Sequence, residues 1–240
     1  MRKLYTSWMQ KIKILIVEDE VAIREGLIDV FVYHGYEVDS SGDGKEGLEK
    51  AISGQFDLVL LDVMLPGLNG FEICNRIREN DRDQAIIMLT AKSSDEDIIE
   101  GLSMGADDYV SKPFSIAQLV LRVQAVLRRT HSVINLENQL ELGGNITIDC
   151  QNYSGIRGDK VLAFTRREIE ILLYLQANTQ RPVPREELLN KVWGYANTVD
   201  LETRTVDIHI AKLRRKIENN PSNPDYLITV RGAGYRLLLT

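Results

Sequence analysis

Residues 58–70 read Leu-Val-Leu-Leu-Asp62-Val-Met-Leu-Pro66-Gly-Leu-Asn-Gly70, and this stretch decides the fold. Its first four residues are apolar without alternation, which is typical of a central strand of a parallel sheet that is buried on both faces. The run ends in an aspartate and is followed by a Pro-Gly turn signal and a segment with helical periodicity. A strand, a loop and a helix in this order predict one unit of an alternating β-α fold.

The same alternation continues on both sides of this unit, over the first 129 residues. Strands are expected at 13–17, 37–40, 58–62, 85–90 and 108–111, and helices at 22–34, 45–53, 70–79, 95–104 and 115–129. Regular alternation at this spacing predicts an α/β domain, with a five-stranded parallel sheet, helices on both faces and right-handed crossovers. The sequence therefore predicts a doubly wound sheet.

The alternation stops after Arg129. Residues 130–139 are polar and unpatterned, so we expect a linker there between domains at 11–129 and 140–240. The second part has four short strand-like pieces (140–142, 145–149, 153–156, 161–163), helical segments at 166–177, 185–192 and 202–218, and a hairpin over 227–239. Thr165 and Glu168 form a capping-box pattern at the first of these helices. This order predicts a second domain, of the α+β class.

Composition and charge fit two soluble domains with different partners. Hydrophobic residues make up 44% of the chain, enough for buried cores, but the apolar runs are too short to span a membrane, so no membrane partner is expected. Residues 1–129 carry 15 basic and 22 acidic side chains (net −7), whereas residues 204–240 carry 7 and 3 (net +4). A locally basic tail indicates a polyanionic partner. The two cysteines, Cys74 and Cys150, have no metal-ligand spacing, which is typical of reduced thiols in a cytoplasmic protein.

Polar side chains follow the predicted strands at their carboxyl ends. Glu18 and Asp19 follow the first strand, Asp62 ends the third, Thr90 ends the fourth and Lys112 follows the fifth. Because these ends share one edge of a parallel sheet, where ligands bind, we expect Asp19, Asp62, Thr90 and Lys112 to converge. Converging carboxylates need a neutralising cation, and an all-oxygen site with few protein ligands suits Mg²⁺. Taken singly, such acidic residues are equally consistent with helix caps or solvated loops.

The first 129 residues resemble the receiver domain of two-component response regulators. The resemblance rests on four motifs: Ile-Leu-Ile-Val-Glu18-Asp19-Glu20, Leu-Asp62-Val-Met-Leu-Pro66-Gly67, Met-Leu-Thr90-Ala-Lys and Gly105-Ala-Asp-Asp-Tyr109-Val-Ser-Lys112-Pro113-Phe114. It covers residues 11–129 and implies a flavodoxin-like fold. It also implies that Asp62 takes a phosphoryl group from a histidine of a sensor kinase, so that the protein is a stoichiometric phosphoacceptor and not an enzyme.

The resemblance also implies roles for the residues around Asp62. Asp19, Asp62 and the backbone carbonyl of Met64 would ligate Mg²⁺, with Glu18 acting through water. Because Met64 would crowd an attacking water, we expect a long-lived phosphoaspartate.

On the strands that follow, Thr90 and Lys112 would bind the phosphoryl oxygens. Tyr109 would then turn inward, although a plain sheet aromatic is the alternative for this residue. A cis bond between Lys112 and Pro113 is implied as well.

In this family, the fourth helix, fifth strand and fifth helix form the active homodimer through charged pairs. Some of that charge remains here, on Glu96, Asp107, Asp108, Arg122 and Arg128. Ile98, Met104 and Gln118 stand where charged residues are common. The resemblance therefore implies a homodimer with fewer charged pairs across its interface to fix the choice of partner.

The helix expected at 202–218 has two faces. Its buried stripe should consist of Val206, Ile210, Leu213 and Ile217. The opposite face presents Arg204, Thr205, Ile208, Lys212 and Arg215, flanked by His209 and Arg214. Thr205 and Lys212 can reach base edges and Ile208 can touch a thymine methyl, while Arg231, in the Gly-rich turn of the hairpin, suits phosphate or minor-groove contact. On charge alone, a solvated helix face is the favoured alternative.

Residues 140–240 resemble the winged-helix effector domain of the OmpR/PhoB class. The resembling segments are Phe164-Thr165-Arg-Arg-Glu168, Val192-Trp193-Gly194-Tyr195, Arg204-Thr205-Val-Asp-Ile-His209-Ile and Val230-Arg231-Gly-Ala-Gly234-Tyr235-Arg236. The likeness implies that the helix at 204–218 enters the major groove of double-stranded DNA at tandem promoter half-sites, and that Arg231 enters the minor groove. The loop after Tyr195 would contact RNA polymerase, although simple core packing explains Trp193 equally well.

Three other functions compete with this interpretation. A phosphatase with an aspartate nucleophile usually carries a second acid two residues later, and Met64 at that position argues for a switch. DNA binding independent of phosphorylation is disfavoured by the intact set of Asp19, Asp62, Thr90 and Lys112. A pure interaction adaptor leaves the basic helix unexplained.

Overall fold

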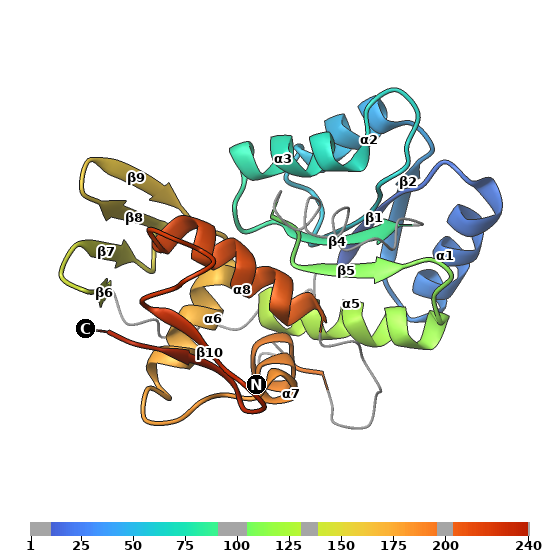
Figure 1. The fold of residues 1–240 in the computed structure, drawn as a ribbon. Coiled ribbons are helices and arrows are strands. Elements are labelled where there is room, and N and C mark those ends of the chain that lie inside the picture. The colour runs from blue at the N-terminus through green and yellow to red at the C-terminus, as the bar shows by residue number, and fades with distance from the viewer. Residues whose placement is uncertain (1–10, 91–104, 131–138, 196–203, 240) are drawn as a thin grey trace, which may run out of the picture.

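The computed structural model describes residues 11–90, 105–130, 139–195 and 204–239. Two groups of elements follow one another along the chain, an α/β group and then a smaller group with short antiparallel strands (Figure 1). The helix expected at 95–104 and nearly all of the expected linker lie outside the described residues.

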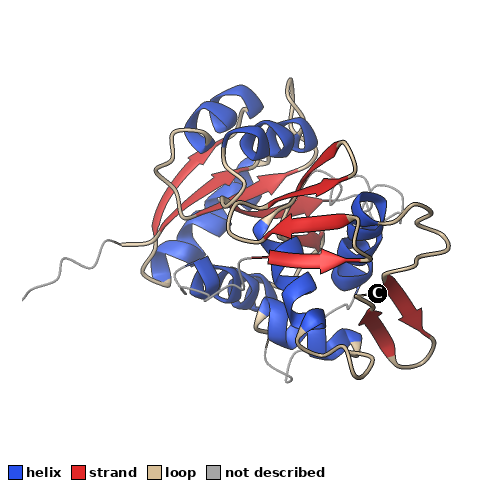
Figure 2. Cartoon of the chain, turned by 90° about the vertical axis from the view of Figure 1, so that its left-hand side faces the viewer, coloured by secondary structure: helices blue, strands red, loops and turns tan. Residues whose placement is uncertain are grey.

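The first group is a five-stranded parallel sheet. Its strands lie in the order β2-β1-β3-β4-β5, with β1 at Lys13–Val17, β2 at Glu37–Ser41, β3 at Leu58–Asp62, β4 at Ala85–Thr90 and β5 at Asp108–Ser111. Helices α1 (Val21–Tyr33), α2 (Gly44–Ala51), α3 (Gly70–Asn80) and α5 (Ile116–Thr130) follow β1, β2, β3 and β5. Figure 2 shows helices on both sides of this sheet. The doubly wound fold expected from the sequence is confirmed.

Alternate strand residues pack into two separate layers of core. Ile14 and Ile16 of β1 face α1 and α5, whereas Leu15 and Val17 face α2 and α3. All four apolar residues of the Leu58–Leu61 run have no exposed area. The lack of alternation in this run is therefore explained by its central position, with a helix layer on each face.

The second group contains a four-stranded antiparallel sheet, helices and a hairpin. Strands β6 (Gln139–Leu142), β7 (Ile146–Asp149), β8 (Ser154–Arg157) and β9 (Lys160–Ala163) pair in sequence order. Helix α6 (Arg166–Gln176) is followed by α7 (Arg185–Leu188), the π-helical turn η1 (Leu189–Trp193), α8 (Arg204–Ile217), and the hairpin of β10 (Leu227–Val230) with β11 (Gly234–Leu237). This order is the one expected for a winged helix.

Local sequence signals explain where the helices of the second group begin and end. Thr165 caps α6 by accepting from the backbone N–H of Glu168, whose carboxylate accepts from the backbone N–H of Thr165, so the predicted capping box is confirmed. The single helix expected at 185–192 is instead a short α-helix followed by a π-turn. Gly194 ends it with a positive φ of 76°, which glycine adopts without strain.

The buried stripe predicted on α8 is also present. Val206, Ile210, Leu213 and Ile217 pack in one cluster with residues of α6, η1 and the first sheet of this domain. Among the described residues, no helix has the length and apolar character that a membrane crossing requires.

Candidate functional site

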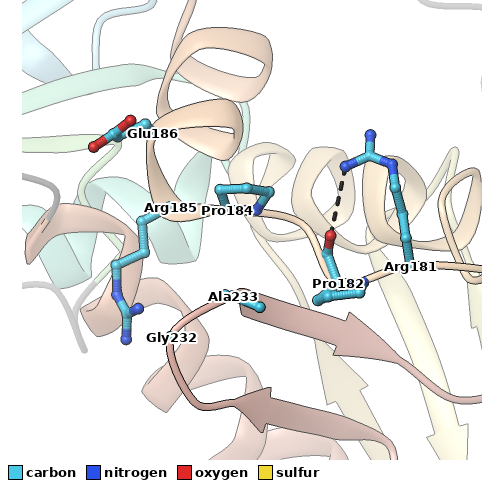
Figure 3. A pocket seen from close by; sticks show the side chains of 8 residues that line it. Arg181, Pro182, Pro184, Arg185, Glu186, Gly232 and Ala233 are labelled. Carbon is cyan, nitrogen blue, oxygen red and sulfur yellow. Dashed lines mark hydrogen bonds between the residues drawn. The ribbon is translucent and has the colours of Figure 1, made fainter.

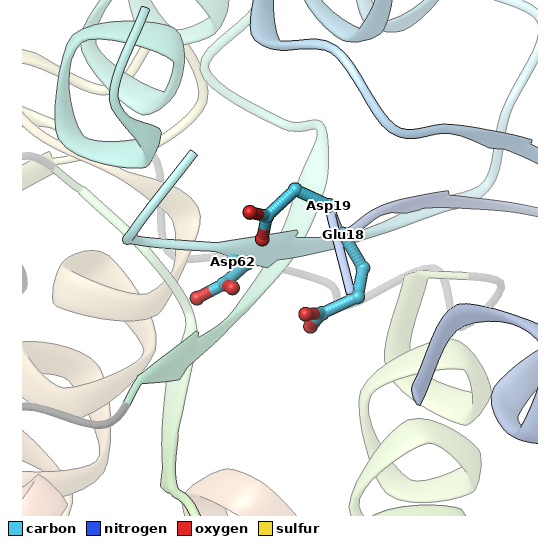
Figure 4. Close-up of side chains that lie close together, drawn as sticks. All are labelled: Glu18, Asp19 and Asp62. Carbon is cyan, nitrogen blue, oxygen red and sulfur yellow. The ribbon is translucent and has the colours of Figure 1, made fainter. Parts of the chain in front are cut away.

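Three carboxylates gather where β1 and β3 end. These strands are neighbours in the sheet, with Val17 opposite Leu61, so the residues that follow them meet at one edge. Oxygens of Glu18, Asp19 and Asp62 lie within 4.8 Å of one another (Figure 4). Glu18 and Asp62 are buried, whereas Asp19 is exposed at the mouth of the group. We call this group the acidic rim.

Lys112 follows β5, the edge strand of the sheet, and its side chain extends to the acidic rim. Its Nζ lies 2.8 Å from Glu18 Oε1 and 2.9 Å from Asp62 Oδ2. Thr90 ends the intervening strand β4 and is fully buried, and its backbone carbonyl accepts a 2.6 Å hydrogen bond from the backbone N–H of Lys112. The bond between Lys112 and Pro113 is cis. The strand ends expected to converge therefore do so.

The charge of the rim is unbalanced. Burial, followed by the neighbouring charge of Asp62, raises the pKa of Glu18 to about 7, although the hydrogen bond from Lys112 opposes this. Burial alone would lower the pKa of Lys112, but its hydrogen bonds with Glu18 and Asp62 raise it. Glu18 and Asp62 thus share one lysine, with Asp19 beside them, and an additional cation would balance the negative charge of the group. The all-oxygen donor set suits Mg²⁺.

The loop after Asp62 is held close to that residue. The backbone N–H of Met64 donates to Asp62 Oδ1 at 3.2 Å, and the Met64 side chain is 54% exposed beside the rim. Gly70, the first residue of α3, approaches the backbone so closely that a Cβ there would lie 2.1 Å from the Asp62 carbonyl oxygen. No sequence pattern marks Gly70, since the close approach joins residues eight apart and leaves no periodic signal.

Tyr109, on β5, is buried in the core layer beneath α3. The same cluster contains Met88 of β4 and, from the second domain, Ile208 of α8. The predicted inward turn of Tyr109 stays a prediction, but the core cluster to which this residue belongs includes a residue of the second domain.

Helix α8 lies against the first domain (Figure 1), and much of the face predicted to bind DNA is buried there. Thr205, Ile208, His209 and Lys212 lie on this face and are at most 6% exposed. Thr205 Oγ1 donates to Asp108 Oδ1 of β5 at 3.2 Å. In this arrangement, which we call the closed arrangement, these four predicted DNA contacts are inaccessible to a duplex. Their role in DNA binding stays a prediction.

Two adjacent aspartates of the first domain accept three hydrogen bonds from the second domain. Asp108 is fully buried and accepts hydrogen bonds from Tyr195 Oη and, at 2.7 Å, from Arg122 of α5. The carbonyl of Asp107 accepts from the indole N–H of Trp193 at 3.0 Å. We call Asp107, Asp108, Trp193, Tyr195 and Thr205 the latch. Simple packing inside its own domain, the alternative considered for Trp193, therefore does not account for its indole N–H.

Lys212 also has a partner within its own domain. Its Nζ lies 3.2 Å from Glu168 Oε1, while Lys216 Nζ lies 2.6 Å from Glu168 Oε2. Burial alone would raise the pKa of Glu168, but the two lysines lower it to about 2. No pattern in the sequence predicts this pairing, because Glu168 and Lys212 are far apart in the chain. Any base contact by Lys212 competes with an ion pair that holds α8 against α6.

The other predicted DNA contacts differ in accessibility. Arg215 of α8 is exposed, and so is Arg231 at the turn of the β10–β11 hairpin. The side chain of Arg204 lies outside the described residues. This hairpin is tied to the chain before α7 by pairing between Val183 and Tyr235. A Cβ at Gly234, where φ is +117°, would lie 2.0 Å from the Val183 carbonyl oxygen, so glycine permits this approach.

An open hollow of about 480 Å³ lies beside this hairpin (Figure 3). Its lining includes Arg181, Arg185 and the glycines of the turn. Arg185 Nε donates to Asp207 Oδ1 at 2.6 Å, and Arg181 pairs with Glu187 at 2.6 Å. Both cations are therefore engaged with carboxylates, and the hollow adds no separate site to the hairpin.

Comparisons with known proteins agree for both halves of the chain. Residues 14–124 match the family model described as response regulator receiver domain, and residues 159–237 match the one described as transcriptional regulatory protein, C terminal. The chain is 40% identical over 231 residues to a probable transcriptional regulator, ycf27, of Porphyridium aerugineum, covering 95% of this chain and 96% of the relative. It is also 40% identical over 237 residues to the alkaline phosphatase synthesis transcriptional regulatory protein PhoP of Bacillus subtilis strain 168, with coverage of 94% and 96%.

Solved structures resemble the chain over almost its whole length. A mutant of RitR, 28% identical, superimposes with a TM-score of 0.69 and covers 95% of this chain and 100% of its own. DrrB, a Thermotoga maritima OmpR/PhoB homolog, is 32% identical with a TM-score of 0.50, and covers 95% and 99%.

Proposed function

The chain belongs to the OmpR/PhoB family of response regulators, DNA-binding proteins of two-component systems, and on this premise we propose that phosphorylation of Asp62 by a sensor histidine kinase releases α8 to bind promoter DNA. The observation that carries the proposal is the position of Asp62. Asp62 is 2% exposed at the acidic rim, and its carboxylate lies 2.9 Å from Lys112 Nζ. Lys112 directly follows β5, the strand that carries Asp108 of the latch.

In the phosphorylation step, an oxygen of Asp62 attacks the phosphorus of a phosphohistidine. The new P–O bond forms as the P–N bond breaks, and the histidine leaves with the electron pair of that bond. Lys112 supplies positive charge to the phosphoryl oxygens, and the Thr90 hydroxyl donates to one of them. The chain thus takes part in its own phosphorylation, and in dephosphorylation by water, without turnover of a substrate.

The rim residues would hold Mg²⁺ as the cofactor. Asp19, Asp62 and the Met64 carbonyl would be its direct ligands, and Glu18 would act through water. When bound, Mg²⁺ would supply the charge neutralisation that the transferring phosphoryl group needs. The shared proximity of three carboxylates and the raised pKa of Glu18 support this assignment.

Strand β5 connects the rim to the latch. Asp107 and Asp108 precede Tyr109 on the chain, and Lys112 follows three residues later. Movement of Thr90 toward the phosphoryl group would let the buried Tyr109 ring shift toward Thr90, which would disturb the core cluster that it shares with Ile208 and displace Asp108. The domains would then separate, because the contacts of α8 with the first domain depend on these residues.

Separation of the domains would also free a surface for a second copy of the chain. Asp107, Asp108 and Arg122 belong to the face predicted to form the homodimer, and in the closed arrangement Asp108 is engaged by the second domain. We therefore propose that dimerisation through the fourth helix, β5 and α5 and closure by α8 exclude each other. The fourth helix lies outside the described residues.

The freed second domain would bind tandem promoter half-sites in double-stranded DNA. Helix α8 would enter the major groove through Arg204, Thr205, Ile208, His209, Lys212 and Arg215, and Arg231 would enter the minor groove. The loop after Tyr195 would contact RNA polymerase, and the protein would act in the cytoplasm, where the DNA is. The proposed domain boundaries remain 11–129 and 140–240.

Selection of bound duplexes from random DNA, with and without a small phosphodonor and Mg²⁺, tests this function. The expected result is that tandem half-sites are recovered only with the donor, and that Asp62→Asn removes the dependence on the donor. Equal recovery of the same sites with and without donor by the wild-type chain would contradict the proposal.

A further inference from the structure

His209 lies where the two domains meet and has no exposed area. It follows Ile208, which packs among core residues of the first domain, and lies four residues after Thr205, which binds Asp108. Its ring packs edge-on against Trp193, with 5.2 Å between the ring centroids. Trp193 in turn donates to the backbone of Asp107. The histidine is therefore enclosed by its own domain on one side and by the first domain on the other.

Neither ring nitrogen of His209 makes a well-formed hydrogen bond among the described residues, although the backbone of Asp107 lies near the ring. A buried polar group without a partner is costly, and an imidazolium in the same place would cost far more. The ring is therefore neutral in the closed arrangement.

The charged groups that face His209 do not change this conclusion. Lys212, on its own helix, and Arg167, from α6, oppose protonation, whereas Glu168 of α6 and the Asp107 backbone favour it. The carboxylate of Glu168 is already shared by Lys212 and Lys216. Burial, followed by Lys212, lowers the pKa of His209 to about 3. From η1, the Trp193 indole packs against the ring.

We propose that His209 makes the latch sensitive to pH, so that acid opens the domain contact without phosphorylation and exposes α8. In the closed arrangement the buried ring stays neutral, because a charge there would be costly. In an opened molecule the ring lies in water, where it can take up a proton. The consequence for DNA rests on the function proposed above, in which α8 reads the duplex. The opening itself does not depend on it.

The size of the effect follows from the two protonation equilibria. In the closed arrangement the pKa is about 3, and in the opened molecule it returns to about 6.5. Above pH 6.5 both forms are neutral, and the latch is at full strength. As the pH falls below 6.5, only the opened form takes up a proton, so the ratio of open to closed molecules rises about tenfold between pH 7.5 and pH 5.5.

The indole N–H of Trp193 reports the opening directly, because its hydrogen bond to Asp107 must break before it exchanges with solvent. Trp8 is the only other tryptophan in the sequence, so Trp8→Phe leaves a single indole signal for NMR. All variants carry Trp8→Phe and Asp62→Asn, which keeps phosphorylation and any titration at the acidic rim the same throughout. In this full-length background, the exchange rate of the Trp193 indole is measured at pH 7.5 and pH 5.5 with His209 and with His209→Gln.

We call the chain with Trp8→Phe and Asp62→Asn and an intact His209 the parent. The exchange rate of the Trp193 indole in the parent, divided by that in the His209→Gln variant, should rise about tenfold from pH 7.5 to pH 5.5. Intrinsic exchange cancels in this ratio because both proteins are measured in the same buffers. His209→Phe is the second variant, since its ring retains the edge-on packing against Trp193 without a titratable nitrogen. It should exchange with the same pH profile as His209→Gln. A parent whose pH profile matches those of both variants would overturn the proposal.

A separate arm keeps this result distinct from the function proposed for Asp62. The Trp8→Phe chain with an intact Asp62 is treated with acetyl phosphate and Mg²⁺ at pH 7.5, where His209 is neutral in both forms. Faster Trp193 exchange in this arm supports control by phosphorylation whatever the acid arm shows. Acid opening in the Asp62→Asn background supports the His209 latch whatever the phosphodonor does.

Discussion

Replacement of Tyr195 by phenylalanine should release α8 without any phosphorylation. The Tyr195 hydroxyl donates to the fully buried Asp108 carboxylate, and the side chain is 4% exposed. A hydrogen bond to a charged group contributes about 1.5–3 kcal/mol. In an opened molecule water replaces this bond, so its loss weakens only the closed form. The ring and its 5.3 Å contact with the Arg122 guanidinium are retained in phenylalanine.

The loss of 1.5–3 kcal/mol corresponds to a closed-to-open ratio lower by roughly ten- to 150-fold. Because apparent affinity scales with the fraction of binding-competent molecules, affinity for a selected duplex should rise by the same factor, up to the affinity of the open form. Fluorescence anisotropy with the unphosphorylated full-length chain at pH 7.5 and fixed salt measures this rise.

Tyr226→Phe is the matched control. Its hydroxyl donates to Asn145 within the second domain, at 3.1 Å and away from the latch, so DNA affinity should not change. Equal affinities for Tyr195→Phe and Tyr226→Phe would refute the assignment of the Tyr195–Asp108 hydrogen bond as a contact that holds the domains together.

Three further outcomes are expected. Met64→Ala, which removes a 54% exposed side chain beside Asp62, should shorten the half-life of the phosphoaspartate several-fold, measured as phosphate release. An unchanged half-life would mean that Met64 does not crowd the attacking water. Gly70→Ala should slow phosphorylation by acetyl phosphate at least tenfold, since its Cβ would lie 2.1 Å from the Asp62 carbonyl oxygen. Gly26→Ala, where a Cβ would meet nothing within 4 Å, should leave the rate unchanged, and equal rates for the two variants would count against this prediction. Glu168→Gln should lower the free energy of unfolding at pH 7 by about 3 kcal/mol, because the pKa of the Glu168 carboxylate is lowered from 4.5 to about 2. The stability that this carboxylate contributes is present above pH 4.5 and is lost as the pH falls toward 2. A urea-denaturation midpoint equal to that of the unsubstituted chain would contradict this.

The fold and the acidic rim followed from local patterns in the sequence. Strand β3 was predictable because a run of apolar residues without alternation, within a regular β-α order, is typical of a strand covered on both faces, and the structure buries Leu58–Leu61 completely. The meeting of Glu18, Asp19, Asp62 and Lys112 followed from topology alone, since the carboxyl ends of parallel strands share an edge. Neither inference required knowledge of a specific long-range contact.

The covering of α8 could not be predicted in this way. Periodicity separates the face of a helix that packs in its own domain from the opposite face, but it does not identify what covers the opposite face. Ile208 was interpreted as a contact to a thymine methyl, and an apolar side chain on that face serves equally well against Tyr109 and Met88. The latch joins residues as far as 97 positions apart, and no pattern within either domain marks them as partners.

The π-turn before Gly194 shows a smaller limit of the same kind. The apolar spacing of 185–192 predicted one helix, and the residues are indeed helical, but the geometry changes at Leu189. The turn places Trp193 so that its indole N–H donates to the backbone carbonyl of Asp107 in the first domain. The helical periodicity of the sequence does not predict this tertiary contact.

The latch joins two parts of one polypeptide, and this fixes how basal activity depends on the amount of protein. An intramolecular contact has the same occupancy in a cell with few copies of the chain as in a cell with many, because its effective concentration is set by the tether. Pairing of two opened copies, in contrast, is second order in protein. Higher expression should therefore amplify the response to a signal much more than it raises the leak in the absence of one. A single substitution such as Tyr195→Phe should remove that protection, and the leak should then increase with gene dosage.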